Sequence, residues 1–121
     1  MSEIATSKKQ ITFYYNSNSG LAKQTLAYAK AEGLPIQTID LIKTKLTGIQ
    51  IVELADKLNI RAADLVNQEH PFYKSNFENH NFSTDDWIKM IQNNPEIMNQ
   101  PIAIRGDITI LVKTPTDIIN I

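Results

Sequence analysis

The chain has 121 residues, of which 42% are hydrophobic and none is cysteine, and its 12 Lys and Arg are balanced by 13 Asp and Glu. This length predicts one domain with a single core. The near-neutral charge excludes a broadly basic nucleic-acid binder, because neutralising phosphates requires a surplus of Lys and Arg. The lack of cysteine excludes disulfides, thiolate metal sites and thiol nucleophiles.

The N-terminal segment is polar and carries no targeting signal. Residues 1–10 lack the apolar stretch of a signal peptide. No apolar run in the chain approaches the ~20 residues of a membrane helix. We therefore expect a cytoplasmic protein that contacts no membrane, with a flexible tail at 1–10 and a single domain at 11–121.

The first part of that domain predicts a strand, a helix and a second strand. Residues 11–15 are β-branched and aromatic, and a polar loop follows them at 16–20. Apolar residues three and four apart predict a helix over 21–31, and residues 34–41 predict the second strand. A strand, helix and strand of this length form a βαβ unit, so we expect the two strands to be parallel.

The middle of the chain predicts helices. Thr47 is the expected N-cap of one helix, and Ser83 is the expected N-cap of another. Residues 61–66 predict a shorter helical piece between them. Residues 70–82 are polar and aromatic without a clear period, which indicates a loop or a broken helix.

The last part predicts a β-hairpin and a final helical turn. Two β-branched runs, 102–104 and 108–112, flank the turn residues Arg105-Gly106-Asp107. Residues 114–119 predict a helical turn. The fold class is therefore α/β (α+β), in the order βαβ…ββα, with an inserted helical segment and a mixed four-stranded sheet.

Four segments in this order resemble one family. They are Tyr15–Gly20 with Lys23–Leu26, Leu41–Thr47, Ile60–Val66 and Asn94–Ile102. Together they resemble the motifs of glutaredoxin-coupled arsenate reductases and of their Spx-type regulator relatives. The resemblance implies a thioredoxin-like fold and a cis peptide bond between Gln100 and Pro101.

The chain differs from that family at the positions of the family's catalytic and oxyanion-binding residues. The resemblance places Ser19 at the reactive cysteine, Asn67 and Gln100 at two oxyanion-binding arginines, and Lys113 near a third. A serine hydroxyl stays protonated at neutral pH without an adjacent base, and oxygen cannot carry out thiol–disulfide exchange. We therefore expect a degenerate member without thiol redox activity, which binds a ligand or partner, and we assign no catalytic residue.

A residual ligand site is expected at the start of the first helix. A helix N-terminus favours anions, and the residues assigned to this site are Asn16, Ser19, Gly20, Lys23, Gln100 and Pro101. The candidate ligands are a small anion and glutathione, which thioredoxin-like proteins hold beside the cis-proline. No bound cofactor and no metal is expected, because His70 and His80 lack a metal-ligand spacing.

Two alternative functions remain open. One is an Spx-like regulatory protein that contacts the transcription machinery without binding nucleic acid directly, with Phe72, Tyr73, Phe77 and Phe82 as a candidate surface for a protein partner. The same aromatic residues have a simpler interpretation, which is that they fix their loop onto the domain. The other alternative is an oxidoreductase-like enzyme that uses glutathione as an external reductant.

Overall fold

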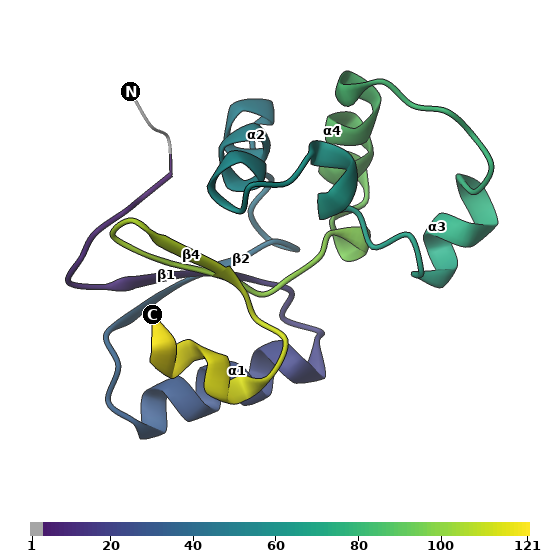
Figure 1. Cartoon of the computed structure of the whole chain (residues 1–121). Helices are drawn as coiled ribbons and strands as arrows, with labels where there is room; N and C mark the ends of the chain where they lie inside the picture. The colour runs from purple at the N-terminus through teal and green to yellow at the C-terminus, as the bar shows by residue number, and fades with distance from the viewer. Residues whose placement is uncertain (1–3) are drawn as a thin grey trace.

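The computed structural model describes residues 4–121, which form a four-stranded sheet with helices on both faces (Figure 1). The strand order is β2-β1-β3-β4. The strands are β1 (Ile11–Tyr15), β2 (Ile36–Asp40), β3 (Ile102–Arg105) and β4 (Ile108–Leu111). β1 pairs in parallel with β2 and antiparallel with β3, which confirms the predicted mixed sheet and hairpin.

One face of the sheet is covered by the first and the last helix of the chain. Helix α1 (Gly20–Ala31) and the C-terminal 3₁₀ helix η3 (Pro115–Asn120) lie side by side beneath the sheet in Figure 1. Their core contains Phe13 from β1, Ala103 from β3 and Ile118 from η3. Alternation of side chains along a strand sends the neighbours of these residues to the opposite face.

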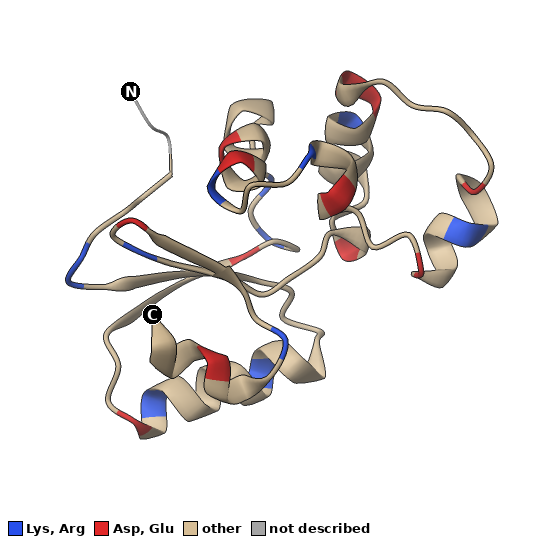
Figure 2. Cartoon of the chain, in the orientation of Figure 1, with Lys and Arg blue, Asp and Glu red and all other residues tan. Residues whose placement is uncertain are grey.

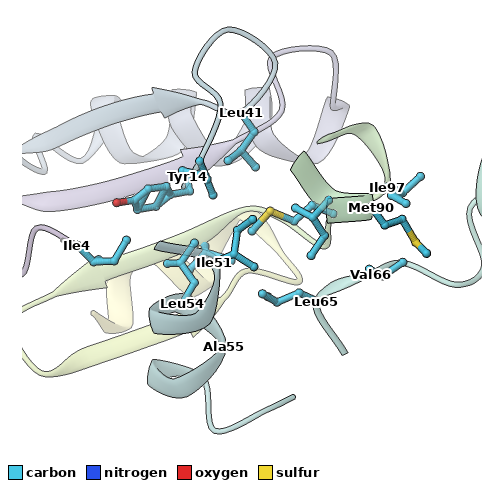
Figure 3. Close-up of a cluster of buried hydrophobic side chains, with 14 of the residues drawn as sticks. Ile4, Tyr14, Leu41, Ile51, Leu54, Ala55, Leu65, Val66, Met90 and Ile97 are labelled. Carbon is cyan, nitrogen blue, oxygen red and sulfur yellow. The ribbon is translucent and has the colours of Figure 1, made fainter. Parts of the chain in front are cut away.

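The opposite face is covered by the helical insert. It comprises α2 (Gly48–Lys57), η1 (Ala62–Leu65), α3 (Pro71–Asn76), α4 (Thr84–Asn93) and η2 (Pro95–Ile97). The larger core lies here and includes Ile102 from β3. Figure 3 shows Tyr14 from β1 with Ile51, Leu54 and Leu65 in this core. β1 and β3 are thus buried on both faces, which explains why their sequences read as continuous apolar runs.

The predicted caps begin their helices as expected. The Thr47 hydroxyl accepts a hydrogen bond from the Gln50 backbone N–H at 3.1 Å, and the Ser83 hydroxyl accepts one from Asp86 at 3.2 Å. In both cases the side chain three residues later accepts a hydrogen bond from the backbone N–H of the cap residue, which completes a capping box. The peptide bond between Gln100 and Pro101 is cis, as predicted.

One segment differs from expectation. Residues 4–10 are held against the hairpin instead of forming a free tail: Ile4 is buried, the Ser7 carbonyl accepts from the Gly106 N–H at 3.0 Å, and the Lys8 carbonyl accepts from Arg105 Nε at 2.9 Å. Residues 1–3 of the expected tail lie outside the described part. Residues 70–82, expected to be a loop or a broken helix, contain the short helix α3, which agrees with the second of these alternatives.

Acidic and basic residues are distributed over both helical layers (Figure 2). This distribution fits the near-neutral composition. Among residues 4–121, no helix is long and apolar enough to cross a membrane. Within the same range, no three His, Asp or Glu side chains are grouped so that they could hold a metal ion.

Candidate functional site

A polar cleft of about 400 Å³ opens at the end of β1, beside the N-terminus of α1. It is lined by Asn16, Asn18, Ser19, Asn67, His70, Glu96, Met98, Asn99 and Gln100. Four of the residues that the sequence singles out therefore lie together: Asn16, Ser19, Asn67 and Gln100. They come from three segments far apart in the chain.

The loop after β1 positions Ser19 through a series of short bonds. The Asn16 carbonyl accepts from the Ser19 N–H at 2.9 Å, and the Asn16 side-chain oxygen accepts from the Asn18 N–H at 2.7 Å. Asp40, at the end of β2, accepts from the Ser17 N–H at 3.3 Å. Ser19 is then the N-cap of α1, and its hydroxyl accepts from the Ala22 N–H at 3.2 Å.

The Asp40 carboxylate that holds this loop is stabilised in its charged form. Partial burial alone would raise its pKa. Hydrogen bonds from Ser17 and from the Ile42 N–H, together with the charge of Lys43, outweigh that effect and hold the pKa of Asp40 below its usual value. Asp40 is therefore an ionised acceptor at neutral pH.

Asn67 reaches the cleft because two extended segments pair. Val66 and Met98 form an antiparallel bridge, the Asn67 N–H donates to the Ile97 carbonyl at 2.7 Å, and the Asn99 N–H donates to the Leu65 carbonyl at 2.6 Å. The pairing places Asn67 beside the residues that precede the cis-proline. It depends on tertiary contact, which no sequence periodicity reveals.

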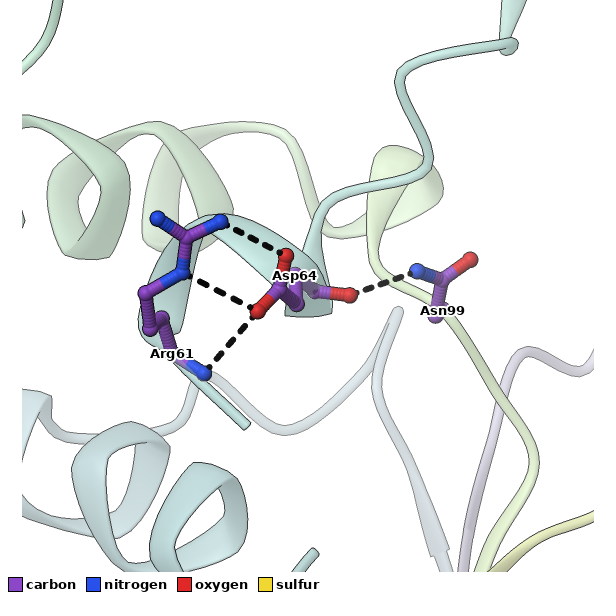
Figure 4. A network of polar contacts seen from close by, with 3 residues as sticks. All are labelled: Arg61, Asp64 and Asn99. Atoms are coloured by element: carbon purple, nitrogen blue, oxygen red, sulfur yellow. Dashed lines mark hydrogen bonds and ion pairs between the residues drawn. The ribbon is translucent and has the colours of Figure 1, made fainter. Parts of the chain in front are cut away.

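A polar network supports the same pairing from outside (Figure 4). Asn99 Nδ2 donates to the Asp64 carbonyl at 2.9 Å, and the Asp64 carboxylate forms a salt bridge with Arg61 at 3.3 Å. Asp64 also accepts from the Arg61 backbone N–H. The Arg61 side chain is thus bound to Asp64.

The remaining residues assigned from the sequence do not line the cleft. Gly20 opens α1, and Pro101 is buried directly before β3. Lys23 is exposed on α1, and Lys113 is exposed next to η3, where its backbone N–H donates to Asp117. No Lys or Arg lines the cleft in the part of the chain that the structure describes.

Sequence reasoning did not assign four polar residues of the cleft, which are Asn18, His70, Glu96 and Asn99. His70 precedes α3, Glu96 lies two residues before Met98, and Asn99 follows Met98 directly. Glu96 and Asn99 belong to the Asn94–Ile102 motif, so their proximity to Gln100 in the chain was an available signal. His70 offered none, because it lies in a segment without a period.

The aromatic residues after His70 pack on one another, with Tyr73 stacked on Trp87 at 6.1 Å between ring centroids.

Comparisons with known proteins give the fold. No family model matches the chain. The uncharacterized protein YfgD of Escherichia coli K12 is 23% identical over 115 residues, covering 93% of this chain and 97% of YfgD. The arsenate reductase from Vibrio cholerae superimposes with a TM-score of 0.82 at 18% identity, covering 95% of this chain and 99% of that one.

A second solved structure agrees. An arsenate reductase (ArsC) related protein from Brucella melitensis superimposes with a TM-score of 0.73 at 14% identity, covering 94% of this chain and 95% of that one. The likeness spans nearly the whole of each protein, so it includes the helical insert as well as the sheet. The fold predicted from the four motifs is confirmed: this chain has the thioredoxin-like α/β fold of arsenate reductase structures.

Proposed function

We propose that this protein carries out no thiol redox chemistry and that its polar cleft binds a small ligand rich in oxygen acceptors. The observation that carries the proposal is the Ser19 hydroxyl at the N-terminus of α1, inside the cleft, at the position where the resemblance expects the reactive cysteine. A cysteine there would be activated by the helix terminus. A hydroxyl is not ionised by such an environment.

Ser19 also lacks the partner that a serine nucleophile needs. Its Oγ accepts from the Ala22 N–H, and no base in residues 4–121 forms a hydrogen bond with it. His70 lines the same cleft, but its Nδ1 accepts from the Phe72 N–H at 3.1 Å. The neutral ring therefore carries its proton on Nε2, which makes Nε2 a donor and not a base.

The amide side chains of the cleft are held in one orientation. Backbone N–H groups donate hydrogen bonds to the side-chain oxygens of Asn16, Asn67 and Gln100, at 2.7, 3.1 and 3.1 Å. None of the three amide nitrogens has an acceptor among the described residues. Together with the Ser19 O–H and His70 Nε2–H, they supply uncharged donors to the cleft.

Uncharged donors favour a ligand that accepts hydrogen bonds but carries little negative charge. An arginine fork binds an oxyanion through charge as well as geometry, and that charge is missing here. Glu96, which lines the cleft, opposes a multiply charged anion. Carbonyl groups and weakly charged oxyanions fit this lining, and the amide and carboxylate oxygens of glutathione belong to the same class.

The redox part of the proposal is tested by turnover. Wild-type protein supplied with arsenate, glutathione and glutaredoxin is expected to show no arsenite formation above a control without protein. The matched variant Ser19→Cys places a thiol at the helix N-terminus. If iodoacetamide alkylates this thiol faster than it alkylates free cysteine at neutral pH, the position activates a thiol. Wild-type turnover above the control would overturn the proposal.

The binding part is tested by NMR titration of the side-chain amide groups. Phosphate and glutathione are used as separate probes, and the NH₂ signals of Asn67 and Gln100 are followed. We expect at least one probe to shift both signals, and phosphate, which carries more negative charge on average, to bind more weakly than glutathione. Unchanged signals with both probes at millimolar concentration would refute the assigned ligand class.

A further inference from the structure

A second cavity of about 240 Å³ lies apart from the polar cleft, under the loop that joins β2 to α2. Its inner wall is apolar: Leu46 from the loop, Ile51 from α2, Ile91 from α4 and Met98 are all buried side chains. Met98 also lines the polar cleft, and it is the one residue common to the two hollows among those described. The two sites therefore share Met98 as a wall residue.

The mouth of this cavity is polar and basic. Lys43, Thr44 and Lys45 line it, and all three are exposed. No residue in the range 4–121 forms a salt bridge with either lysine, and no described carboxylate lines the cavity. Asp40 lies close enough to Lys43 to be stabilised by it, but its Oδ1 already accepts from Ser17 and Ile42.

The loop that carries these groups is fixed. The Asp40 carbonyl accepts from the N–H groups of Lys43 and Thr44, at 3.1 and 2.8 Å. At the other end, Gln92 Nε2 donates to the Leu46 carbonyl at 3.1 Å, which ties the loop to α4. The mouth is thus shaped by backbone contacts at both ends, and a ligand entering it would meet a formed site.

We propose that this cavity binds a small amphiphilic monocarboxylate, with its apolar part against Leu46, Ile51 and Ile91 and its carboxylate at Lys43, Thr44 and Lys45. An apolar interior removes hydrocarbon from water, and two ammonium groups that form no salt bridge with a described residue, together with a hydroxyl, suit a carboxylate at the mouth. The volume is below the ~300–1,000 Å³ of sites for drug-sized ligands, so the occupant is short. Hexanoate has this chemistry.

The test is an NMR titration with three probes that share one hydrocarbon chain: hexanoate, hexanol and hexylamine. Hexanoate is expected to shift the backbone signals of Thr44 and Leu46, hexanol to bind more weakly, and hexylamine to bind least. The signals of Ser19 and Asn67 separate this site from the polar cleft, because a ligand confined to the cavity leaves them unchanged. This readout does not depend on whether the cleft binds its own ligand.

Variants assign the two parts of the site. The double variant Lys43→Gln/Lys45→Gln is expected to weaken hexanoate about fivefold, because exposed ion pairs are individually weak, and to leave hexanol unchanged. Thr44→Trp, at an exposed position, is expected to cover the mouth and abolish binding of both. Lys30→Gln on α1, in the opposite layer, is the matched control and should bind hexanoate as wild type does.

Three results would overturn the inference. The first is absence of any shift at Thr44 and Leu46 with hexanoate at millimolar concentration. The second is hexanol or hexylamine binding as tightly as hexanoate, which would remove the role of the lysines. The third is equal weakening by the double variant and by Lys30→Gln, which would attribute the effect to net charge and not to the mouth of the cavity.

Discussion

The side-chain oxygen of Gln100 accepts a hydrogen bond from the backbone N–H of Asn16 at 3.1 Å. The bond joins the residue before the cis-proline to the first residue of the loop that presents Ser19. An arginine, which the resemblance expects at this position, has only donors and cannot accept this bond. Gln100 thus has a structural role that the family residue could not fulfil.

Replacing Gln100 is therefore expected to destabilise the cleft in a way that depends on the new side chain. Gln100→Ala and Gln100→Arg both leave a partly buried N–H without an acceptor, which costs about 1–3 kcal/mol of unfolding free energy. Gln100→Glu keeps an acceptor oxygen and serves as the control, with a smaller loss. Denaturant unfolding of the three variants makes the comparison. A Gln100→Arg protein as stable as wild type would contradict the role assigned to this bond.

The N-cap at Ser19 gives a second stability prediction. Ser19→Ala removes the acceptor of the Ala22 N–H and is expected to cost about 1 kcal/mol. Ser19→Asp retains an acceptor and adds a negative charge at the helix N-terminus, so its stability should remain close to that of wild type. Thermal unfolding of both variants is the measurement. If Ala and Asp were equally destabilising, the hydroxyl would not be acting as a cap.

The fold was predictable because local and long-range signals agree. Thr47 and Ser83 mark helix starts through chemistry that acts within one turn, and continuous apolar runs marked β1 and β3. The start of helix α3 was harder to predict from the sequence, because its cap is the ring nitrogen of His70, an uncommon capping group. Ile4 was missed because a single apolar residue in a polar segment has no period to reveal its burial.

The site was predictable only in part, for a physical reason. Asn16, Ser19 and Gln100 lie in motifs near the strand ends, and the resemblance extended the set to Asn67. The contribution of His70 depends on the pairing of Val66 with Met98, which is a tertiary contact. Which amide atom is left without a partner depends on backbone donors that no sequence pattern specifies.

Charge in the cleft is tested by Glu96→Gln. Removing the one carboxylate that lines the cleft within the described chain is expected to tighten phosphate binding about two- to fivefold, as for the loss of a single surface charge interaction. The gain should shrink as salt is added, because exposed charges are screened. Calorimetric titration at low and high salt measures both effects. Glu32→Gln, at the far end of α1, is the control. Equal gains from both variants would indicate a change in net charge alone.

Asp117 gives a prediction for acid stability. Hydrogen bonds from the N–H groups of Thr114 and Lys113, and from the Thr114 hydroxyl, lower its pKa. A carboxyl whose pKa is lower when folded stabilises the protein above the unfolded pKa of ~3.9, and this contribution is lost as pH falls through the folded value. Asp117→Asn should therefore be less stable than wild type at neutral pH, and the difference between the two proteins should decrease as pH falls below the unfolded pKa of ~3.9.

The control for Asp117 is Asp107→Asn in the hairpin turn, since the structure shows no hydrogen bond or ion pair between the Asp107 carboxylate and any described residue. Denaturant unfolding is measured at both pH values for each variant. A constant difference between Asp117→Asn and wild type across the range would show that the loss comes from packing and not from the carboxylate.

Gly106 tests whether the N-terminal segment is held by the hairpin. Its φ is +60°, where residues with a Cβ are strained, and an added Cβ would lie 2.9 Å from Lys8 Cγ. Gly106→Ala should therefore cost about 1 kcal/mol through strain in the turn, with further displacement of the segment that bonds to it through Ser7.

The matched control for Gly106 is Gly20→Ala at the start of α1, where nothing lies within 4 Å of the added methyl group. Its stability should be unchanged or slightly raised, because alanine restricts the unfolded chain. Hydrogen exchange at Gly106 provides the specific readout, since this N–H donates to the Ser7 carbonyl. In wild type it should exchange slowly. Fast exchange there would mean that residues 4–10 do not rest on the hairpin in solution, and the loss in Gly106→Ala would then be due to the turn alone.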